Sequence, residues 1–332
     1  MDNIYLAYRK ARKGKSWQDT VKVFEANLEK NIQTIYLSLK NKSFTTSPYT
    51  TFTIYEPKPR LVYRLPFNPD RIVQHALMNI LEPIWDRMFI YDSYSCRKGK
   101  GIHAGSLRTM EFIRKVGKDG YCLKMDVSKF YPSIDHDILF EIIKKKIKCK
   151  DTLWLLYDII YSIKGGKGIP IGNYTSQWLG NLYLHELDLF IKQSWKVKYY
   201  IRYCDDAIVL HKEKSFLNEL AQAISEFLQR KLKLKLKKSV VFPLKHGIDF
   251  LGYRHFPSYK LLRKSTAIRL KRRFRKLPTL FWQGKINSKQ FLSSVMSALG
   301  WLRHCNCYNL KVHILNEKVL CILKQIYPKE VI

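Results

Sequence analysis

Two adjacent aspartates, Asp205 and Asp206, interrupt two short apolar runs of residues that favour β-strands. The runs cover residues 199–202 and 207–210. Two such runs joined by a short polar break are typical of a β-hairpin, so we expect both acids at its tip. Like charges held this close repel each other unless a cation lies between them. The pattern therefore predicts a divalent-metal site on a rigid hairpin.

The charge of the chain indicates a polyanionic partner. The sequence has 60 Lys and Arg residues against 27 Asp and Glu residues, a formal charge of +33 over 332 residues. Hydrophobic residues make up 46% of the chain, which is enough for a folded core. The sequence has no clear basic amphipathic helix beside an apolar anchor, so nucleic acid is favoured over an anionic membrane as the partner. A metal site in so basic a chain suggests chemistry on phosphates.

Signals for export, membrane insertion and disulfides are weak. The N-terminus begins with an acidic residue and lacks the apolar segment of a signal peptide. The most apolar stretch, residues 153–163, is short and contains Asp158, so we expect a core helix there. The seven cysteines are irregularly spaced, which favours free thiols and a cytoplasmic location, in a bacterial host or encoded by a phage. His304, Cys305 and Cys307 lack a second ligand cluster, so we favour buried thiols over a zinc site.

The order of periodic segments predicts an α+β fold with a central antiparallel sheet and a helical C-terminal region. Helical spacing covers residues 3–40, 71–88, 176–190 and 215–230, and everything after about residue 263. Strand patterns cover residues 50–55, 61–65 and 121–127. A further helix starts near Ser133 or Asp135, either of which can serve as its N-cap.

Asp126 lies at the end of the expected strand 121–127, far in sequence from the aspartate pair. Neighbouring positions for the two strands in one sheet would bring all three carboxylates together. Such a cluster can hold two Mg²⁺ ions for in-line attack of a hydroxyl on phosphorus, with one ion activating the attacking oxygen and the other steadying the leaving pyrophosphate. A solvated turn is the ordinary interpretation of an isolated Asp-Asp pair. The glycine-rich residues 165–168 lack the spacing of a P-loop.

Four segments occur in an order that carries a family resemblance: residues 126–134, 168–177, 203–206 and 247–253. Together they resemble the palm motifs of a reverse transcriptase, and the resemblance extends over nearly the whole chain. It implies an RNA-directed DNA polymerase with a right-hand fold, Mg²⁺ as cofactor and Mn²⁺ as a substitute. The implied domains are fingers at 1–120, a palm at 121–258 with a fingers insertion at about 138–168, and a helical thumb at 259–332.

Carried across residue by residue, the resemblance implies metal-binding and catalytic roles for Asp126, Asp205 and Asp206, with Val127 beside them. Tyr131 matches the aromatic residue that blocks a ribose 2′-hydroxyl, with a plain core aromatic as the alternative. Gly172 is expected to let the backbone approach the templating base pair closely.

Basic residues are the second set of implied binding groups, with solvated surface cations as the alternative. The resemblance implies contacts with the incoming nucleotide for Lys58, Arg64, Arg97, Lys98 and Lys238. It implies that a basic helix grips the template and primer backbones through Arg269, Arg272, Arg273, Arg275 and Trp282.

Ile171 and Gln177 depart from the usual reverse transcriptase pattern, which has glutamine before the glycine and proline after the serine. The pattern Ile-Gly-Asn-x-x-Ser-Gln resembles reverse transcriptases of diversity-generating retroelements, as do residues 52–60, 90–101 and 299–305. The resemblance implies copying of a template repeat RNA, from deoxynucleoside triphosphates, into adenine-mutagenised cDNA for targeted protein diversification (mutagenic retrohoming). It also implies a small, basic accessory variability protein that forms a pentamer.

We hypothesise that Ile171 lowers fidelity, with Arg64 as a second fidelity residue. Ile171 replaces an amide that can report on pairing geometry, and one hydrogen bond contributes about 1 kcal/mol net. A simple packing role is the alternative for Ile171. For the whole chain, the alternatives are a group II intron-like or retron reverse transcriptase, and a non-catalytic RNA-binding scaffold. A scaffold would be expected to have lost a catalytic acid, yet all three are present.

Overall fold

The computed structural model describes residues 1–55 and 59–326. Lys58, expected to contact the nucleotide, lies outside the described residues. The chain divides into two compact units, each built from three stretches of sequence. Unit 1 comprises Met1–Lys98, Lys124–Ile208 and Asn218–Ser239, and unit 2 comprises Gly99–Leu123, Val209–Leu217 and Val240–Ile332. The expected fingers, palm and thumb boundaries remain a prediction.

Three helices open unit 1 where helical spacing indicated one long segment: α1 (Asp2–Arg12), α2 (Asp19–Ala26) and α3 (Leu28–Lys40). Gly14 has a φ of +72° after α1, and Asn27 leaves helical geometry between α2 and α3. Packed against α1 is α4 (Ile72–Met88), which continues from the π-helix η1 (Phe67–Arg71). The Asn3 side chain joins the two helices by donating to the carbonyl oxygen of Ala76 at 2.9 Å.

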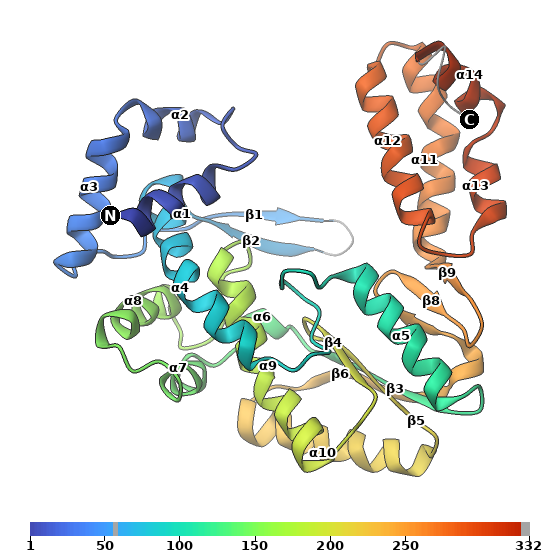
Figure 1. Ribbon diagram of the computed structural model, residues 1–332, viewed down its shortest axis with the longest axis horizontal. Coiled ribbons are helices and arrows are strands. Elements are labelled where there is room, and N and C mark those ends of the chain that lie inside the picture. The colour runs from blue at the N-terminus through green and yellow to red at the C-terminus, as the bar shows by residue number, and fades with distance from the viewer. Residues whose placement is uncertain (56–58, 327–332) are drawn as a thin grey trace. The chain divides into compact units, whose positions relative to one another are not determined.

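A two-stranded antiparallel hairpin follows, as the sequence predicted. Strands β1 (Thr50–Ile54) and β2 (Arg60–Arg64) pair from Thr50 opposite Arg64 to Ile54 opposite Arg60. β1 is exposed along its whole length, so the hairpin projects from the core rather than covering it (Figure 1).

The main sheet has the strand order β4 (Tyr200–Tyr203), β5 (Asp206–His211), β3 (Tyr121–Val127), β6 (Leu236–Pro243). β3 and β5 are therefore neighbours (Figure 1), as we expected from the prediction that Asp126 lies close to Asp205 and Asp206. Helix α9 (Tyr174–Leu189) is buried along nearly all its length, because it is apolar on most sides. It continues into η2 (Phe190–Ser194), and α10 (Lys214–Leu232) connects β5 to β6.

The remaining helices of unit 1 are short: α6 (Phe130–Ser133), α7 (His136–Lys144) and α8 (Lys150–Tyr161). Of the two N-caps proposed for this region, Asp135 caps α7, since its carboxylate accepts from the backbone N–H of Ile138 at 3.1 Å. α8 includes most of the apolar stretch expected to form a core helix, and its buried residues are Leu155, Leu156, Ile159 and Ile160.

Unit 2 has its own sheet and its own helical core. It contains α5 (Ile102–Val116), the short η3 (Leu244–His246) and an antiparallel sheet of β7 (Ile248–Phe250), β8 (Tyr253–His255) and β9 (Lys260–Leu262). Four helices follow: α11 (Lys264–Trp282), α12 (Ser288–Leu302), α13 (Tyr308–Ile314) and α14 (Glu317–Ile326). Their apolar faces meet at fully buried residues such as Phe274, Phe291 and Ile322.

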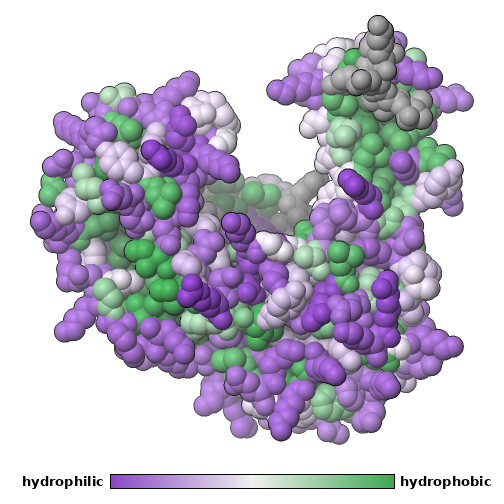
Figure 2. All heavy atoms as spheres, in the orientation of Figure 1, coloured by the Kyte–Doolittle hydropathy of each residue, from purple (hydrophilic) through white to green (hydrophobic). Residues whose placement is uncertain are grey.

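These elements confirm the α+β class with antiparallel sheets and a helical C-terminal region. Within the described part of the chain, no helix is long and apolar enough to cross a membrane. Figure 2 shows hydrophilic side chains over most of the visible face, in keeping with the charge of the chain.

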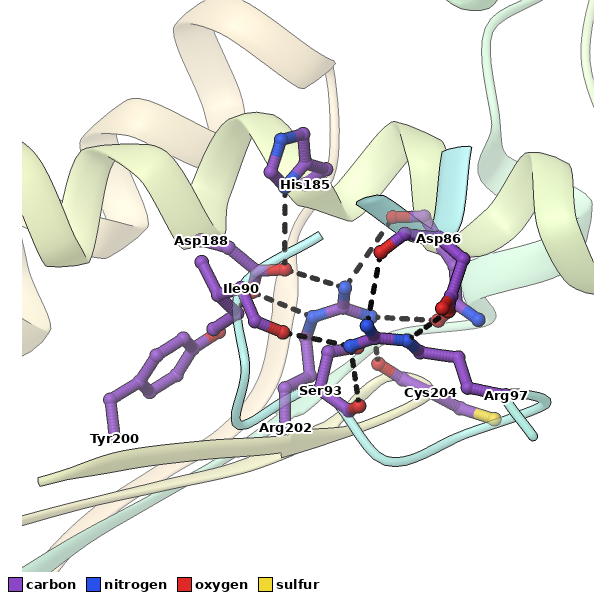
Figure 3. Close-up of polar contacts among 10 residues, drawn as sticks. Asp86, Ile90, Ser93, Arg97, His185, Asp188, Tyr200, Arg202 and Cys204 are labelled. Atoms are coloured by element: carbon purple, nitrogen blue, oxygen red, sulfur yellow. Dashed lines mark hydrogen bonds and ion pairs between the residues drawn. The ribbon is translucent and has the colours of Figure 1, made fainter. Parts of the chain in front are cut away.

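A buried ion pair fixes β4 to α9 (Figure 3). The guanidinium of Arg202, only 1% exposed, donates to both carboxylate oxygens of Asp188, with its Nε at 2.7 Å and its Nη2 at 2.6 Å. The Tyr200 hydroxyl donates to the same carboxylate at 2.8 Å. Arg202 also donates to the Asn181 side chain at 3.1 Å and to the carbonyl oxygen of Cys204 at 3.0 Å. A buried ion pair is tolerated only when its remaining polar atoms are satisfied, and here they largely are.

Replacing Asp188 by alanine is expected to lower the free energy of unfolding by about 3–5 kcal/mol, because it leaves the Arg202 charge buried without a counter-ion. Urea denaturation followed by circular dichroism measures this change. Lys42→Ala is the control, because the pair of Lys42 with Asp151 is half-exposed and contributes about 1 kcal/mol or less. Equal losses in the free energy of unfolding for Asp188→Ala and Lys42→Ala would contradict the structural role of the buried pair of Arg202 with Asp188.

Candidate active site

The aspartate pair lies at the tip of the β4–β5 hairpin, as predicted. Cys204 forms the turn with a φ of +51°, and Asp206 is the first residue of β5. Both strands are buried on either side of the turn, so the tip is held by the sheet core. Arg202 holds the Cys204 carbonyl oxygen, and the Ser95 hydroxyl lies 2.7 Å from the Cys204 sulfur. The backbone before Asp205 is therefore fixed from two sides.

A cavity of about 600 Å³ opens in front of this turn, within unit 1. Two carboxylates line it, those of Asp126 and Asp205. The other lining residues that bear on chemistry are the cations Arg60, Lys129, Lys167 and Lys237, the aromatic residues Tyr63, Phe130 and Tyr131, and Val127, Gly168 and Ile171. The cavity thus combines acids, cations and one apolar wall, a composition suited to a metal-bound phosphate ester.

Asp126 lies close enough to Asp205 to affect the ionisation of Asp205. Burial raises the pKa of Asp205, and the neighbouring charge of Asp126 raises it further, while Arg60 opposes the shift. A divalent cation would remove this repulsion, and two carboxylates beside the main chain of Val127 form the oxygen-rich donor set that Mg²⁺ prefers. The donor set therefore fits the expected ion.

Asp206 is placed differently from the other two acids. Its carboxylate lies 3.8 Å from the Nζ of Lys124, on the neighbouring strand β3. Throughout residues 1–55 and 59–326, no three His, Cys, Asp or Glu side chains are grouped as a metal site. The structure thus joins Asp126 with Asp205 at the cavity and pairs Asp206 with a lysine.

Tyr131 lies in the cavity wall directly after the buried Phe130. Gly180 of α9 makes room for it, since a Cβ there would lie 3.2 Å from the rings of both Phe130 and Tyr131. Burial is the main cause that raises the pKa of Tyr131 far above its usual value, so the phenol stays neutral. The ring is therefore an uncharged, fixed obstacle at the cavity.

Ile171 and Gly172 connect the cavity wall to the β1–β2 hairpin. The Ile171 carbonyl oxygen accepts from the backbone N–H of Tyr63 at 2.8 Å, and its side chain lines the cavity. Gly172 has a φ of +125°, and a Cβ there would lie 2.3 Å from the Tyr63 carbonyl oxygen. The close neighbour that requires glycine within the protein is therefore strand β2, and the approach of Gly172 to the templating base pair stays a prediction.

Four basic residues expected at the nucleotide, Arg64, Arg97, Lys98 and Lys238, do not line the cavity that contains Asp126 and Asp205, and their role stays a prediction. Arg97 donates to the Asp86 carboxylate at 2.5 Å and to the carbonyl oxygens of Ile90 and Ser93, so its guanidinium belongs to the scaffold in Figure 3. Arg64 lines a different cavity, and neither Lys98 nor Lys238 lines the active one.

Arg60 and Lys237 are the cations that sequence reasoning missed, together with Lys129 and Lys167. Lys237 precedes Lys238 on β6, and the alternation of side chains along a strand sends these two neighbours to opposite faces. Arg60 was part of the charged turn in the sequence, but only the fold shows that it acts on Asp205.

The basic residues expected to bind nucleic acid lie on one helix, α11. Arg269, Arg272, Arg273, Arg275 and Trp282 are all exposed, while Phe274 and Leu277 of the same helix are buried. Arg273 donates to the Ser294 hydroxyl at 2.7 Å. The helix thus presents cations outward over an apolar base, and their role in binding stays a prediction.

Comparison with known proteins identifies the family. The sequence profile described as "Reverse transcriptase (RNA-dependent DNA polymerase)" matches residues 56–255, which is more than half of the chain and includes the whole cavity. The chain belongs to the reverse transcriptase family. The prediction of that family from four sequence motifs is confirmed.

Individual relatives of this reverse transcriptase are distant. It is 24% identical to Protein YkfC of Escherichia coli strain K12 over 258 residues, covering 62% of this chain and 67% of that protein. It is 29% identical to the group II intron-encoded protein LtrA of Lactococcus lactis subsp. cremoris over 208 residues, covering 58% of this chain and 34% of LtrA. The chain thus spans about a third of LtrA.

A solved structure supports the polymerase fold. Apo telomerase from Candida tropicalis superposes with a TM-score of 0.50 at 14% identity, covering 84% of this chain and 57% of the telomerase chain. At that identity the likeness shows the fold alone, and it agrees with the right-hand polymerase expected from the sequence.

The raised pKa of Asp205 predicts a pH-dependent gain in stability for Asp205→Asn in magnesium-free buffer. The native state resists ionisation of this carboxyl, so the destabilisation is complete above the raised pKa of the folded state and fades as the pH falls from there to the pKa of the unfolded state, about 4. The variant should therefore melt at a higher temperature than the wild type at neutral pH and at the same temperature in acid.

Added Mg²⁺ should raise the melting temperature of the wild type and leave Asp205→Asn nearly unchanged, since only the wild type has the full ligand pair. Asp19→Asn, at an exposed position on α2, is the matched control and should behave like the wild type. A wild type that does not respond to magnesium would contradict the metal site.

Proposed function

We propose that this reverse transcriptase copies a template repeat RNA into adenine-mutagenised cDNA, as the polymerase of a diversity-generating retroelement. The observation that carries the proposal is Ile171, an apolar residue in the active cavity at a position where most of the family has an amide. The family itself supplies the RNA-directed DNA polymerase activity. The fingers, palm and thumb are assigned to residues 1–120, 121–258 and 259–332.

Chain extension would use Asp126 and Asp205, with Val127 beside them, as ligands of divalent cations, Mg²⁺ or Mn²⁺. When bound, these cations lower the barrier by favouring the attacking hydroxylate and the leaving pyrophosphate. The ion pair between Asp206 and Lys124 would help to keep strands β5 and β3 aligned at the turn. The raised pKa of Asp205 supports this assignment, because a bound cation most strongly stabilises a carboxylate that another negative charge repels.

The incoming deoxynucleoside triphosphate would lie among the cations of the cavity. Its phosphates would be neutralised by the four cations that line the cavity, Arg60, Lys129, Lys167 and Lys237. These would take the place of most of the cations that we expected there from the sequence. Tyr131 would exclude a ribose 2′-hydroxyl by its bulk, because the half-buried ring is packed close to Gly180 of α9 and has little freedom to move aside.

The apolar side chain of Ile171 would contact the nascent base pair but could not form a hydrogen bond that depends on the geometry of the pair. An amide at this position can test the pair by hydrogen bonding, whereas the sec-butyl side chain of isoleucine supplies only bulk. The backbone of Ile171 is held by Tyr63, so the side chain would keep its place whichever base is opposite. Loss of one hydrogen bond reduces discrimination severalfold and leaves synthesis intact.

The partners proposed for the reaction are template RNA, the growing cDNA and an accessory variability protein of pentameric form, in the cytoplasm. The exposed cations of α11 would contact the nucleic-acid backbone. Similarity to LtrA favours a second candidate, a group II intron-like reverse transcriptase. The two kinds of reverse transcriptase differ at the positions of Ile171 and Gln177. Frequent misincorporation opposite template adenine would favour the diversity-generating retroelement enzyme over the group II intron-like one.

Primer extension by the purified chain on an RNA template tests the catalytic assignment. Asp126→Asn and Asp205→Asn should each lower the rate at least about a hundredfold, since each removes a ligand of the reacting metal ions. Asp19→Asn should retain the wild-type rate. Equal residual synthesis in the wild type and both active-site variants would favour a non-catalytic RNA-binding scaffold.

Ile171→Gln should lower misincorporation opposite template adenine by about two- to fivefold, because it restores one hydrogen-bonding group at the pair. Deep sequencing of cDNA made on the cognate RNA, with and without the accessory protein, measures the error rate. Ile171→Val keeps an apolar side chain and should keep the high error rate. An active Ile171→Gln enzyme with unchanged errors at adenine would reject the fidelity role.

A further inference from the structure

Two free cysteines meet beside the aspartate turn, within unit 1. Cys96 lies in the loop between α4 and α5, and Cys204 directly precedes Asp205. The Ser95 hydroxyl lies 2.7 Å from the Cys204 sulfur and 3.2 Å from the Cys96 sulfur. The two thiols are also hydrogen-bonded to each other. The fold thus brings together two thiols that lie far apart along the chain.

The backbones that carry the two thiols are bonded to each other. The Arg202 N–H of β4 donates to the Asp92 carbonyl oxygen at 3.0 Å, and the Tyr94 N–H donates to the Arg202 carbonyl oxygen at 2.9 Å. The Arg97 guanidinium, directly after Cys96, donates to a carboxylate and to two carbonyl oxygens of the same loop (Figure 3). The loop and the hairpin therefore hold the two sulfur atoms in a fixed mutual position.

The two thiols differ in access to solvent. Cys96 is exposed, whereas Cys204 is half-buried. Hydrogen bonds from Cys204, and to a lesser extent from Ser95, lower the pKa of the Cys96 thiol. An accessible thiol that readily forms a thiolate, next to a second thiol, is the arrangement found in cysteines that sense oxidants. A dissolved oxidant would therefore react first with Cys96, and Cys204 is within reach to complete a disulfide.

A disulfide at this place would act on the active site. Cys204 is the residue before Asp205, and its side chain is hydrogen-bonded to Tyr131 in the cavity wall. Two bonded sulfur atoms lie about 2.05 Å apart, closer than any non-bonded contact between them. Closing this distance also separates the Cys204 sulfur from the Ser95 hydroxyl. The disulfide therefore pulls on the turn that positions Asp205.

We propose that Cys96 and Cys204 are a redox-sensitive modification site, at which a hydroperoxide converts the two thiols to a disulfide and slows polymerisation. The site depends on the polymerase activity of the family and is independent of the assignment to a diversity-generating retroelement. A dithiol reductant would reverse the change by thiol–disulfide exchange.

The reaction balances with hydrogen peroxide as the oxidant. The Cys96 thiolate attacks one peroxide oxygen, the O–O bond breaks, and the hydroxide released takes up a proton to give water. The Cys204 sulfur then attacks the sulfur of the Cys96 sulfenic acid. The S–S bond forms, the S–O bond breaks, and the hydroxyl group leaves with the Cys204 proton as a second water. The two thiols lose two electrons, and the peroxide gains them.

Mass spectrometry tests the modification without any need for activity. The purified chain is treated with hydrogen peroxide, the excess is removed with catalase, the remaining thiols are alkylated, and proteolytic peptides are analysed. We expect a peptide containing Cys96 linked to a peptide containing Cys204, and we expect dithiothreitol to separate them. Absence of this linked pair after peroxide treatment would overturn the proposal.

Primer extension on an RNA template, with the same oxidised sample, tests the effect on catalysis. The rate should fall at least about tenfold, because small displacements of a catalytic group are costly, and dithiothreitol should restore it. Cys96→Ser should extend primers at the wild-type rate both before and after peroxide. Cys305→Ser is the matched control: it removes a thiol of unit 2 whose sulfur lies 3.3 Å from that of Cys307, and it should respond to peroxide as the wild type does.

Cys96→Ala is a second variant that should resist peroxide, and melting temperatures close to that of the wild type show that the variants are folded. Two further results would overturn the proposal. One is a linked pair of peptides in an enzyme whose rate is unchanged. The other is equal loss of activity in the wild type and in a folded Cys96→Ser, which would place the sensitive group elsewhere.

Discussion

The buried pair of Arg202 and Asp188 is the interaction on which the active site depends. Arg202 lies on β4, three residues before Asp205, and its guanidinium links the core helix α9 to the carbonyl oxygen of the hairpin turn. An apolar residue there would pack as well but could not fix the turn. Burying two charges costs desolvation free energy, but the resulting network of directional bonds sets the position of the turn before Asp205.

A second constraint is the contact between the Ile171–Gly172 segment and strand β2. Because Gly172 has no side chain, the Tyr63 backbone can lie against it and bond to Ile171. The segment therefore contributes to two cavities: Ile171 lines the one with Asp126 and Asp205, and Gly172 lines the one with Gln74 and His75.

Sequence reasoning succeeded where the signal was local. The hairpin with Asp205 at its tip and the helix-only region after residue 263 follow from spacing and from single-residue preferences, and the same preferences narrowed the N-cap of α7 to Ser133 or Asp135. It could not show which polar groups would pair with one another. Arg97 has the chemistry of a phosphate ligand, but its guanidinium donates to Asp86 and to the carbonyl oxygens of Ile90 and Ser93, and only the folded loop brings these nearby residues into contact with it.

The sequence by itself determined the family, the fold class and the residues at the hairpin tip, because four ordered motifs and the periodicity of apolar residues are properties of the chain alone. Only the tertiary structure decided which charges meet. It placed Asp126 beside Asp205 and turned Asp206 toward Lys124, and it chose Arg60 and Lys237 over Arg64 and Lys238 for the active cavity. The physical reason is that a charge acts over a few ångströms in space, and the fold alone sets the distances between residues that lie far apart along the chain.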